Sequence, residues 1–206
     1  MLKHSISFLL IMSLFISCHR DKDFVKVKDD QGNLLEKYTI NKKTQQKNGI
    51  YYRYFRDKSI DEVAHYKDGL LEGQRILFFK TGDTMTIETH HNDLFEGVFK
   101  TFFKNGQLES IGQYIDNKMA GIWKYYYDNG QLKEQVTFSD NNENGPFIEY
   151  YKNGHLKAKG NYKTNEINAD TDQKEHGIIE LYDENGVLEK KMDCNFGRCK
   201  TIWTRD

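Results

Sequence analysis

Residues 121–144 read GIWKYYYDNGQLKEQVTFSDNNEN, and this stretch decides the fold class. Its first seven residues are rich in aromatic side chains, which favour strands. Asn129-Gly130 follows, and Asn-Gly is the strongest short-range signal for a two-residue type I′ hairpin turn. From Leu132 to Phe138 apolar and polar residues alternate, as in a strand with one buried face. The stretch therefore predicts a β-hairpin, with polar residues 139–144 as the loop to the next hairpin.

The same unit recurs along the chain at a fixed period. The glycine that begins it has counterparts 24 residues apart, except for a last gap of 32. Such a period is the signature of an array in which one small unit stacks on its neighbours. We expect an all-β protein, an elongated single-layer antiparallel meander of repeated β-hairpins. The repeat glycines are Gly49, Gly73, Gly97, Gly121, Gly145 and Gly177.

The period also divides the chain into segments. Residues 24–48 contain the turn-like Gln31-Gly32-Asn33-Leu34 and are predicted to form a partial capping repeat. Residues 49–193 form six repeats, and residues 194–206 form a C-terminal cap. The longer last gap corresponds to an eight-residue insertion within residues 163–176, which is polar and acidic and is expected to be a surface loop.

The predicted turn also fixes a strand register. If Asn129 and Gly130 form a two-residue loop, Tyr127 faces Leu132 and Trp123 faces Val136. The same rule places large rings opposite glycine, an arrangement that a one-residue slip would destroy. We therefore expect the glycines to recur because the facing ring needs the space of a Cβ. The predicted ring–glycine pairs are Gly121–Phe138, Phe99–Gly112, Gly97–Tyr114, Phe147–Gly160 and Gly145–Tyr162.

Composition agrees with a thin sheet and excludes one class of partner. Aromatic residues make up 14% of the chain, and 26 of the 28 are Tyr or Phe. The 30 basic and 31 acidic residues are interspersed and give a net charge of −1. A nucleic-acid-binding protein carries a basic patch or stripe, which this pattern lacks. We therefore expect no nucleic-acid partner.

The amino terminus resembles an export signal. Residues 1–17 combine a short polar start with an apolar run from Ile6 to Ile16, the usual length of a signal-peptide core and too short for a bilayer-spanning helix. The run ends in Leu14-Phe15-Ile16-Ser17-Cys18, which resembles a bacterial lipobox. The resemblance implies lipidation of Cys18, a tether over residues 18–23 and attachment to the membrane by acyl chains. His19 after the cysteine favours an outer membrane lipoprotein, on the periplasmic or the cell-surface side. The alternative is an ordinary cleavable signal with an incidental cysteine.

Two further cysteines lie near the carboxyl end, in Cys194-Asn-Phe-Gly-Arg-Cys199. In an oxidising compartment they can close a small loop as a disulfide. Two free thiols are the alternative. A zinc site is disfavoured, because structural zinc wants four ligands.

No motif of catalytic chemistry appears. The sequence lacks a nucleophile elbow, a phosphate loop, a metalloprotease helix motif and a dinucleotide fingerprint. His90-His91 is the most suggestive pair, but His90 occupies a position that is aromatic in the other repeats. We therefore predict no enzyme, no cofactor and no metal site.

One repeated feature suggests binding. Five residues after each repeat glycine stands an aromatic residue, and by strand alternation these rings point to the face opposite Trp123. Lys100, Lys124 and Lys152 are predicted to share that face. The rings could pack with neighbouring side chains to shield a thin sheet, or they could form a stacking surface for an extended ligand. The candidate binding residues are Tyr54, Phe78, Phe102, Tyr126, Tyr150 and Tyr182.

The repeat pattern as a whole resembles a known family. Gly-x-aromatic-x-x-aromatic-aromatic-x-Asn-Gly-x-Leu, followed by an aromatic and a polar return to glycine, is similar to the MORN-variant repeat of bacterial YwqK-family antitoxins. The resemblance covers about residues 24–193. It implies a meander of hairpins and carries over no catalytic residue.

These observations predict a non-catalytic, membrane-anchored repeat protein that acts as a binding or scaffolding module at the cell envelope. Its partner would be an unidentified protein, peptide or glycan. The alternative is a toxin-neutralising protein, of antitoxin or immunity type, that sequesters a partner protein.

Overall fold

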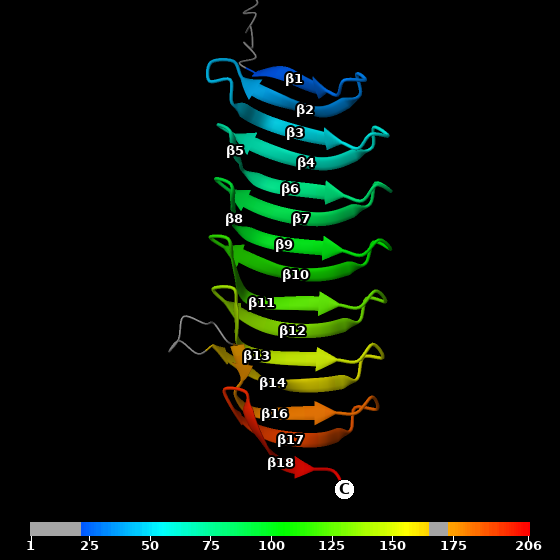
Figure 1. Ribbon diagram of the computed structural model, residues 1–206, viewed down its shortest axis with the longest axis vertical. Coiled ribbons are helices and arrows are strands. Elements are labelled where there is room, and N and C mark those ends of the chain that lie inside the picture. Colours follow the sequence, from blue (N-terminus) through cyan, green and yellow to red (C-terminus); the bar gives the residue numbers. More distant parts are fainter. Residues whose placement is uncertain (1–21, 165–172) are drawn as a thin grey trace, which may run out of the picture.

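The computed structural model describes residues 22–164 and 173–206, and the proposed signal peptide and Cys18 lie outside this part of the chain. The described residues form one open antiparallel sheet (Figure 1). In the described ranges no helix is long and apolar enough to cross a membrane. The strands are β1 (Lys22–Lys28), β2 (Leu34–Asn41), β3 (Lys47–Tyr54), β4 (Ile60–Lys67), β5 (Leu70–Leu71), β6 (Gly73–Phe78), β7 (Thr84–His91), β8 (Leu94–Phe95), β9 (Gly97–Phe102), β10 (Leu108–Ile115), β11 (Lys118–Tyr126), β12 (Leu132–Ser139), β13 (Asn142–Tyr150), β14 (Leu156–Thr164), β15 (Gln173–Glu175), β16 (Gly177–Tyr182), β17 (Leu188–Asn195) and β18 (Arg198–Thr204).

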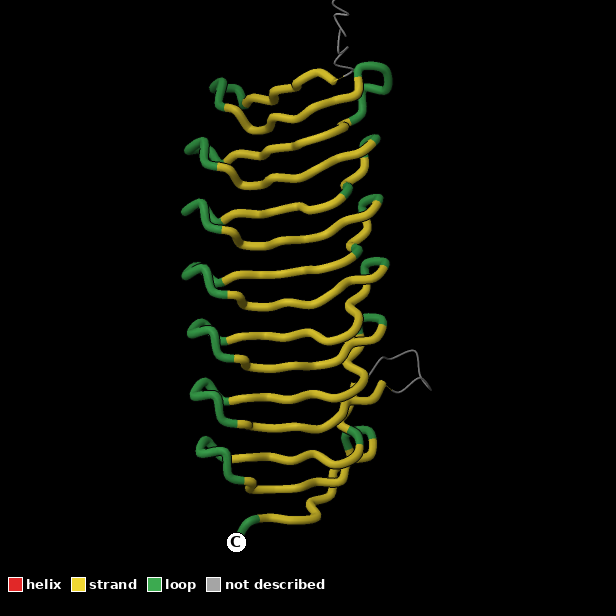
Figure 2. Tube along the Cα trace, turned by 180° about the vertical axis from the view of Figure 1, so that it is seen from behind, coloured by secondary structure: helices red, strands yellow, loops and turns green. Residues whose placement is uncertain are grey.

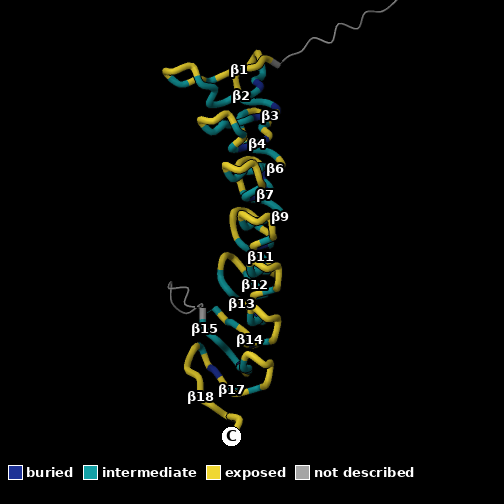
Figure 3. The backbone as a smooth tube through the Cα atoms, turned by 90° about the vertical axis from the view of Figure 1, so that its right-hand side faces the viewer, coloured by how far each residue is buried: buried dark blue, intermediate teal, exposed yellow. Residues whose placement is uncertain are grey.

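The sheet is a meander, as predicted. Each long strand pairs antiparallel with the long strands before and after it in sequence, for example β11 with β10 and β12. The strands stack one above another along a straight axis (Figure 1), and from the side the sheet is narrow (Figure 3). The predicted single-layer meander is confirmed.

The turns differ from the prediction. At the Asn129-Gly130 edge, Tyr127 N donates to Gln131 O at 2.8 Å and Gly130 N donates to Tyr127 O at 2.9 Å. Gly130 has a φ of 83°, and Asn129 is not among the described residues with positive φ. This is a three-residue loop, a type I turn closed by a glycine bulge, and not a two-residue type I′ turn. The prediction that Tyr127 faces Leu132 was therefore wrong, because the bulge places Tyr126 opposite Leu132.

Type I′ turns occur at the opposite ends of the strands, within the segment that was predicted to be a loop. Asp140 and Asn141 have φ values of 51° and 69° and join Ser139 directly to Asn142. Residues 139 and 142–144 belong to strands β12 and β13. The tube in Figure 2 shows both columns of turns, one at each end of the strands. The equivalent pairs with positive φ are Asp68-Gly69, Asn92-Asp93, Asp116-Asn117 and Phe196-Gly197.

Side chains in both turn columns tie neighbouring repeats together. At one edge, the Asn129 side-chain amide donates to Lys152 O at 3.2 Å, one repeat further along. At the other edge, Asn141 Oδ1 accepts from Met119 N at 2.7 Å. Equivalent bonds of Asn105 and Asn153 on the first side, and of Asp93 and Asn117 on the other, keep the turns of these repeats aligned.

The repeat glycines have a different role from the one expected. A Cβ on Gly121 would meet no atom within 4 Å, so this position does not leave room for a ring. Its φ of 67° lies in the left-handed region, which L side chains rarely adopt. All six repeat glycines have positive φ, and the register shifts just before them, as between Val136 and Phe138 in the β12–β13 pair. They bend the strand so that the short segment before each glycine crosses one face of the sheet.

The predicted ring–glycine pairs are nevertheless present in the register, as is Trp123 opposite Val136. A Cβ has no room at Gly112 and Gly160, but the group that takes most of the space comes from the next strand and not from the facing rings, Phe99 and Phe147. A Cβ on Gly112 would overlap the Trp123 ring of the next strand, and a Cβ on Gly160 would overlap Ile179.

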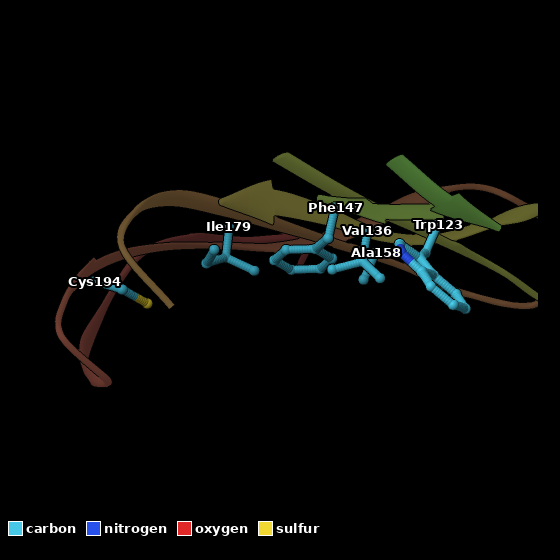
Figure 4. Close-up of a cluster of buried hydrophobic side chains, with 6 residues drawn as sticks. All are labelled: Trp123, Val136, Phe147, Ala158, Ile179 and Cys194. Atoms are coloured by element: carbon cyan, nitrogen blue, oxygen red, sulfur yellow. The ribbon is translucent and has the colours of Figure 1, made fainter. Parts of the chain in front are cut away.

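The bent segments cover one face, which we call the covered face, and leave the other, the open face. Phe95, two residues before Gly97, lies 4.5 Å from the His90 ring and 5.1 Å from Tyr114. Towards the carboxyl end the covered face holds the apolar core shown in Figure 4. The core residues are Trp123, Val136, Phe147, Ala158, Ile179 and Cys194.

The two ends of the sheet close differently. Residues 24–48, predicted as a partial capping repeat, hold β1, β2 and the start of β3. Residues 194–206 hold β18, which is exposed along its whole length. Cys194 and Cys199 form a disulfide at the turn between β17 and β18. Of the insertion, residues 165–172 lie outside the described ranges, and β15 pairs with the end of β14.

Candidate binding face

The six aromatic residues singled out above occupy equivalent places. Each is the last residue of its strand, beside the three-residue turn, and each is half-buried. We call this set the aromatic ladder: Tyr54 (β3), Phe78 (β6), Phe102 (β9), Tyr126 (β11), Tyr150 (β13) and Tyr182 (β16). Successive members lie two strands apart, because one return strand intervenes between them.

The bulge gives each ladder ring an unpredicted neighbour. Phe102 pairs with Leu108 and Tyr126 with Leu132 across the turn, and in four of the six repeats this neighbour is leucine. The rings are half-buried beside these neighbours, which agrees with the packing alternative that the sequence left open.

Next to the ladder the open face keeps large apolar side chains exposed. Positions one residue after the repeat glycine carry Ile50, Val98, Ile122 and Ile178, whose exposed fractions range from 38% to 55%. A single-layer sheet cannot bury both faces, and contiguous exposed apolar groups commonly mark interaction surfaces.

Two shallow hollows lie on the open face at equivalent places two repeats apart. The first, of about 420 Å³, has Val98, Ile111 and Ile122 in its lining and Tyr126 at one side. The second, of about 370 Å³, has Pro146, Lys159 and Ile178 at the corresponding positions. The hollows were not predicted from the sequence, because they arise where Gly112 and Gly160 place no side chain on the sheet. Repeated hollows suit an extended ligand better than a compact one.

The lysines of this face divide into two kinds. Lys100 and Lys124 stand two residues before Phe102 and Tyr126 on the same strands, hence on the same face. Within the described ranges neither takes part in an ion pair. Lys152 lies instead in the turn after Tyr150, where its Nζ is 2.5 Å from Asp128 Oδ1. It therefore belongs to the column of three-residue turns and not to the open face.

At the carboxyl end the charged groups of the open face are paired with one another. The Glu180 carboxylate accepts from Lys159 and Lys191, each at 2.8 Å, and from the Tyr182 hydroxyl at 2.7 Å. Hydrogen bonds from Lys159, Lys191 and Tyr182 lower the pKa of Glu180 to about 2. Lys100 on β9 and Lys124 on β11 have no such partner among the described residues, so the unpaired ammonium groups lie in the middle of the ladder.

The covered face contains an ionic chain that the sequence analysis did not find. Arg75 Nε donates to Glu62 Oε1 at 2.7 Å, and Arg75 Nη1 donates to Glu88 Oε2 at 3.1 Å. Arg53 binds Glu62 from the other side at 2.9 Å, and His90 Nε2 lies 2.9 Å from Glu88 Oε2. The hydrogen bond to Glu62 raises the pKa of Arg75, so its charge is fixed. The available signal was the charge of Arg75 and Glu88 at inward strand positions where the later repeats carry apolar residues or glycine.

His90 was predicted to be a ring in the sheet, and its place agrees with that prediction. It is 5% exposed, its ring lies against that of Phe95 at an interplanar angle of 38°, and it contacts Glu88. Among the residues that the structure describes, no group of three His, Cys, Asp or Glu side chains could hold a metal ion.

The model of the MORN repeat variant matches residues 95–116, 119–140, 143–164 and 175–193. Residues 95–193 carry four MORN-variant repeats. A search of curated proteins finds no match at the required significance.

The matched frame agrees with the turns. The match over 119–140 begins just after the type I′ turn at Asp116-Asn117 and ends at the next one, Asp140-Asn141. A MORN-variant repeat here is thus a hairpin bounded by two type I′ turns, with the three-residue turn in its middle. Residues 49–94 continue the same architecture before the first matched segment, with the ionic chain in place of the apolar core.

Proposed function

We propose that this chain is a non-catalytic binding module, anchored through a lipidated Cys18 at the bacterial cell envelope, whose open face holds an extended ligand. The observation that carries the binding role is the aromatic ladder beside repeated apolar hollows. A repeat architecture of this kind offers a long surface and no deep cleft. The lipobox-like Leu14–Cys18 supports the anchor.

The anchor is tested by fractionation. Cys18→Ala in the full chain should move the protein from the membrane fraction to the soluble fraction, since the acyl chains are the proposed attachment. Ser17→Ala, which keeps a small residue before the cysteine, serves as the control and should leave the protein in the membrane fraction. Unchanged fractionation of Cys18→Ala would refute the lipoprotein proposal.

The binding face is tested by affinity capture from envelope fractions. The triple variant Phe102→Ala, Tyr126→Ala and Tyr150→Ala should lose the captured material while circular dichroism and thermal unfolding still show a folded sheet. A matched control replaces two lysines near the ends of the strands, Lys104→Ala with Lys118→Ala, and should capture the same material as the parent. A captured toxin whose toxicity this chain relieves would favour the neutralising role over scaffolding.

A further inference from the structure

The middle of the open face combines a straight row of rings with the unpaired ammonium groups of Lys100 and Lys124. Turn-to-turn hydrogen bonds at both edges, such as Asn105 Nδ2 to Asp128 O at 2.7 Å, hold successive repeats in line (Figure 1). The ladder rings therefore recur at twice the strand separation, about 10 Å. A ligand that uses several rings must be straight and must repeat at this distance.

We infer that the ligand of the open face is an extended β-1,4-linked polysaccharide that bears carboxylates. This inference rests on the proposed function of that face. In such a polymer the same sugar face recurs at every second residue, a repeat that matches the two-strand spacing of about 10 Å. The apolar side of a sugar ring can stack on each aromatic ring, as flat apolar groups do on Tyr and Phe.

The charge argues for an acidic sugar. Lys100 and Lys124 each stand beside a ladder ring and have no ion pair within the described part of the chain. Lys133 also lines a hollow with Tyr126, but the acidic side chains of Glu109 and Asp128 line the same hollow. The lysines of this face that lack an acidic partner among the described residues are therefore Lys100 and Lys124. At the carboxyl end the equivalent position of Lys124 is Glu180, which is already paired with Lys159 and Lys191. A carboxylate on the sugar next to Phe102 and Tyr126 would complete the missing pairs.

A peptide fits this place less well. Extended peptides are usually bound by adding a strand to a sheet edge, where backbone N–H and C=O groups are free. The ladder lies on a face of paired strands, away from the edge strands β1 and β18. Backbone pairing is therefore not offered along the ladder, whereas ring stacking and ammonium–carboxylate contacts are.

The test is calorimetric titration of the full chain with two hexasaccharides of the same linkage. The acidic probe is hexamannuronate, and the uncharged probe is cellohexaose. We expect hexamannuronate to bind more tightly, with an affinity that falls as salt is raised. Lys100→Gln with Lys124→Gln should weaken hexamannuronate at least tenfold and leave cellohexaose unchanged. Lys104→Gln with Lys118→Gln is the control and should change neither.

Phe102→Ala with Tyr126→Ala should weaken the binding of both sugars. If this variant loses stability, the Lys100/Lys124 variant still tests the inference. No binding of either sugar, or full hexamannuronate affinity in the Lys100/Lys124 variant, would overturn the inference. If sugars fail to bind but the triple ladder variant still loses a captured protein, the open face is a binding face for protein and only the glycan assignment fails. If the ladder variant loses nothing, the proposed function fails as well.

Discussion

The indole of Trp123 occupies the space that a side chain on Gly112 would need. Gly112 lies in β10 and Trp123 in the neighbouring β11, and the indole is 2% exposed. The rings of Tyr114 and Phe99 pack against it with centroid distances of 5.3 and 5.8 Å.

Gly112→Ala should therefore destabilise the protein by about 1–3 kcal/mol, as overpacking of a tight core does. Gly121→Ala is the comparison: its Cβ meets no atom within 4 Å, but its φ of 67° should cost about 1 kcal/mol. Urea denaturation measures both. A Gly112→Ala variant as stable as the parent would show that the indole can shift.

The sequence predicted the strand register well because a large ring and a missing side chain are complementary, and a slip removes that fit. Phe99 opposite Gly112 and Phe147 opposite Gly160 follow from this rule. It predicted the turns less well. Asn-Gly was assigned to a type I′ turn from local preference, whereas the Asn side chain of Asn129 is used to reach the next repeat. That contact is non-local and cannot be inferred from one hairpin.

The candidate face was located by strand alternation alone, since every second residue points to the same side. The hollows and the ionic chain were not predicted, because both depend on contacts between repeats. Glu62 and Glu88 lie on different hairpins, and only the stacking of β4, β6 and β7 brings them to the same arginine, Arg75. A search for motifs within one segment does not detect such a group.

Lys58 occupies the position in its turn that glycine fills in the equivalent turns. Its φ is 73°, close to the 81° of Gly106, and a non-glycine residue in the left-handed region costs about 1–2 kcal/mol. Lys58→Gly removes this cost, but glycine also gives the unfolded chain more conformational entropy. The net result should be a stabilisation of up to about 1 kcal/mol. The reverse change, Gly106→Lys, should destabilise by a similar amount. Thermal unfolding of both variants checks the pair, and a loss of stability in Lys58→Gly would contradict the assignment.

Arg75 should be the residue of the ionic chain that is least replaceable. Its guanidinium binds both Glu62 and Glu88, whose side chains are only 4% and 8% exposed. Arg75→Gln leaves two buried carboxylates short of a cation, and we expect a loss of about 3 kcal/mol. Adding Glu62→Gln should restore part of the stability, since one uncompensated charge is then removed. A double-mutant cycle by urea denaturation measures this coupling, and strictly additive losses would show that the contacts are not coupled.

Glu180 should make stability depend on acid pH. Hydrogen bonds from Lys159, Lys191 and Tyr182 lower its pKa from 4.5 to about 2 in the folded chain. The folded state thus holds the proton less tightly than the unfolded state, so this stabilisation is present above about pH 4.5 and is lost as the pH falls towards 2. Between pH 6 and pH 3 the parent should therefore lose more unfolding free energy than Glu180→Gln does. Glu189→Gln, at an exposed carboxylate on the adjacent strand, should lose as much as the parent. Parallel pH profiles for the parent and Glu180→Gln would show that the Glu180 contacts contribute nothing to folding.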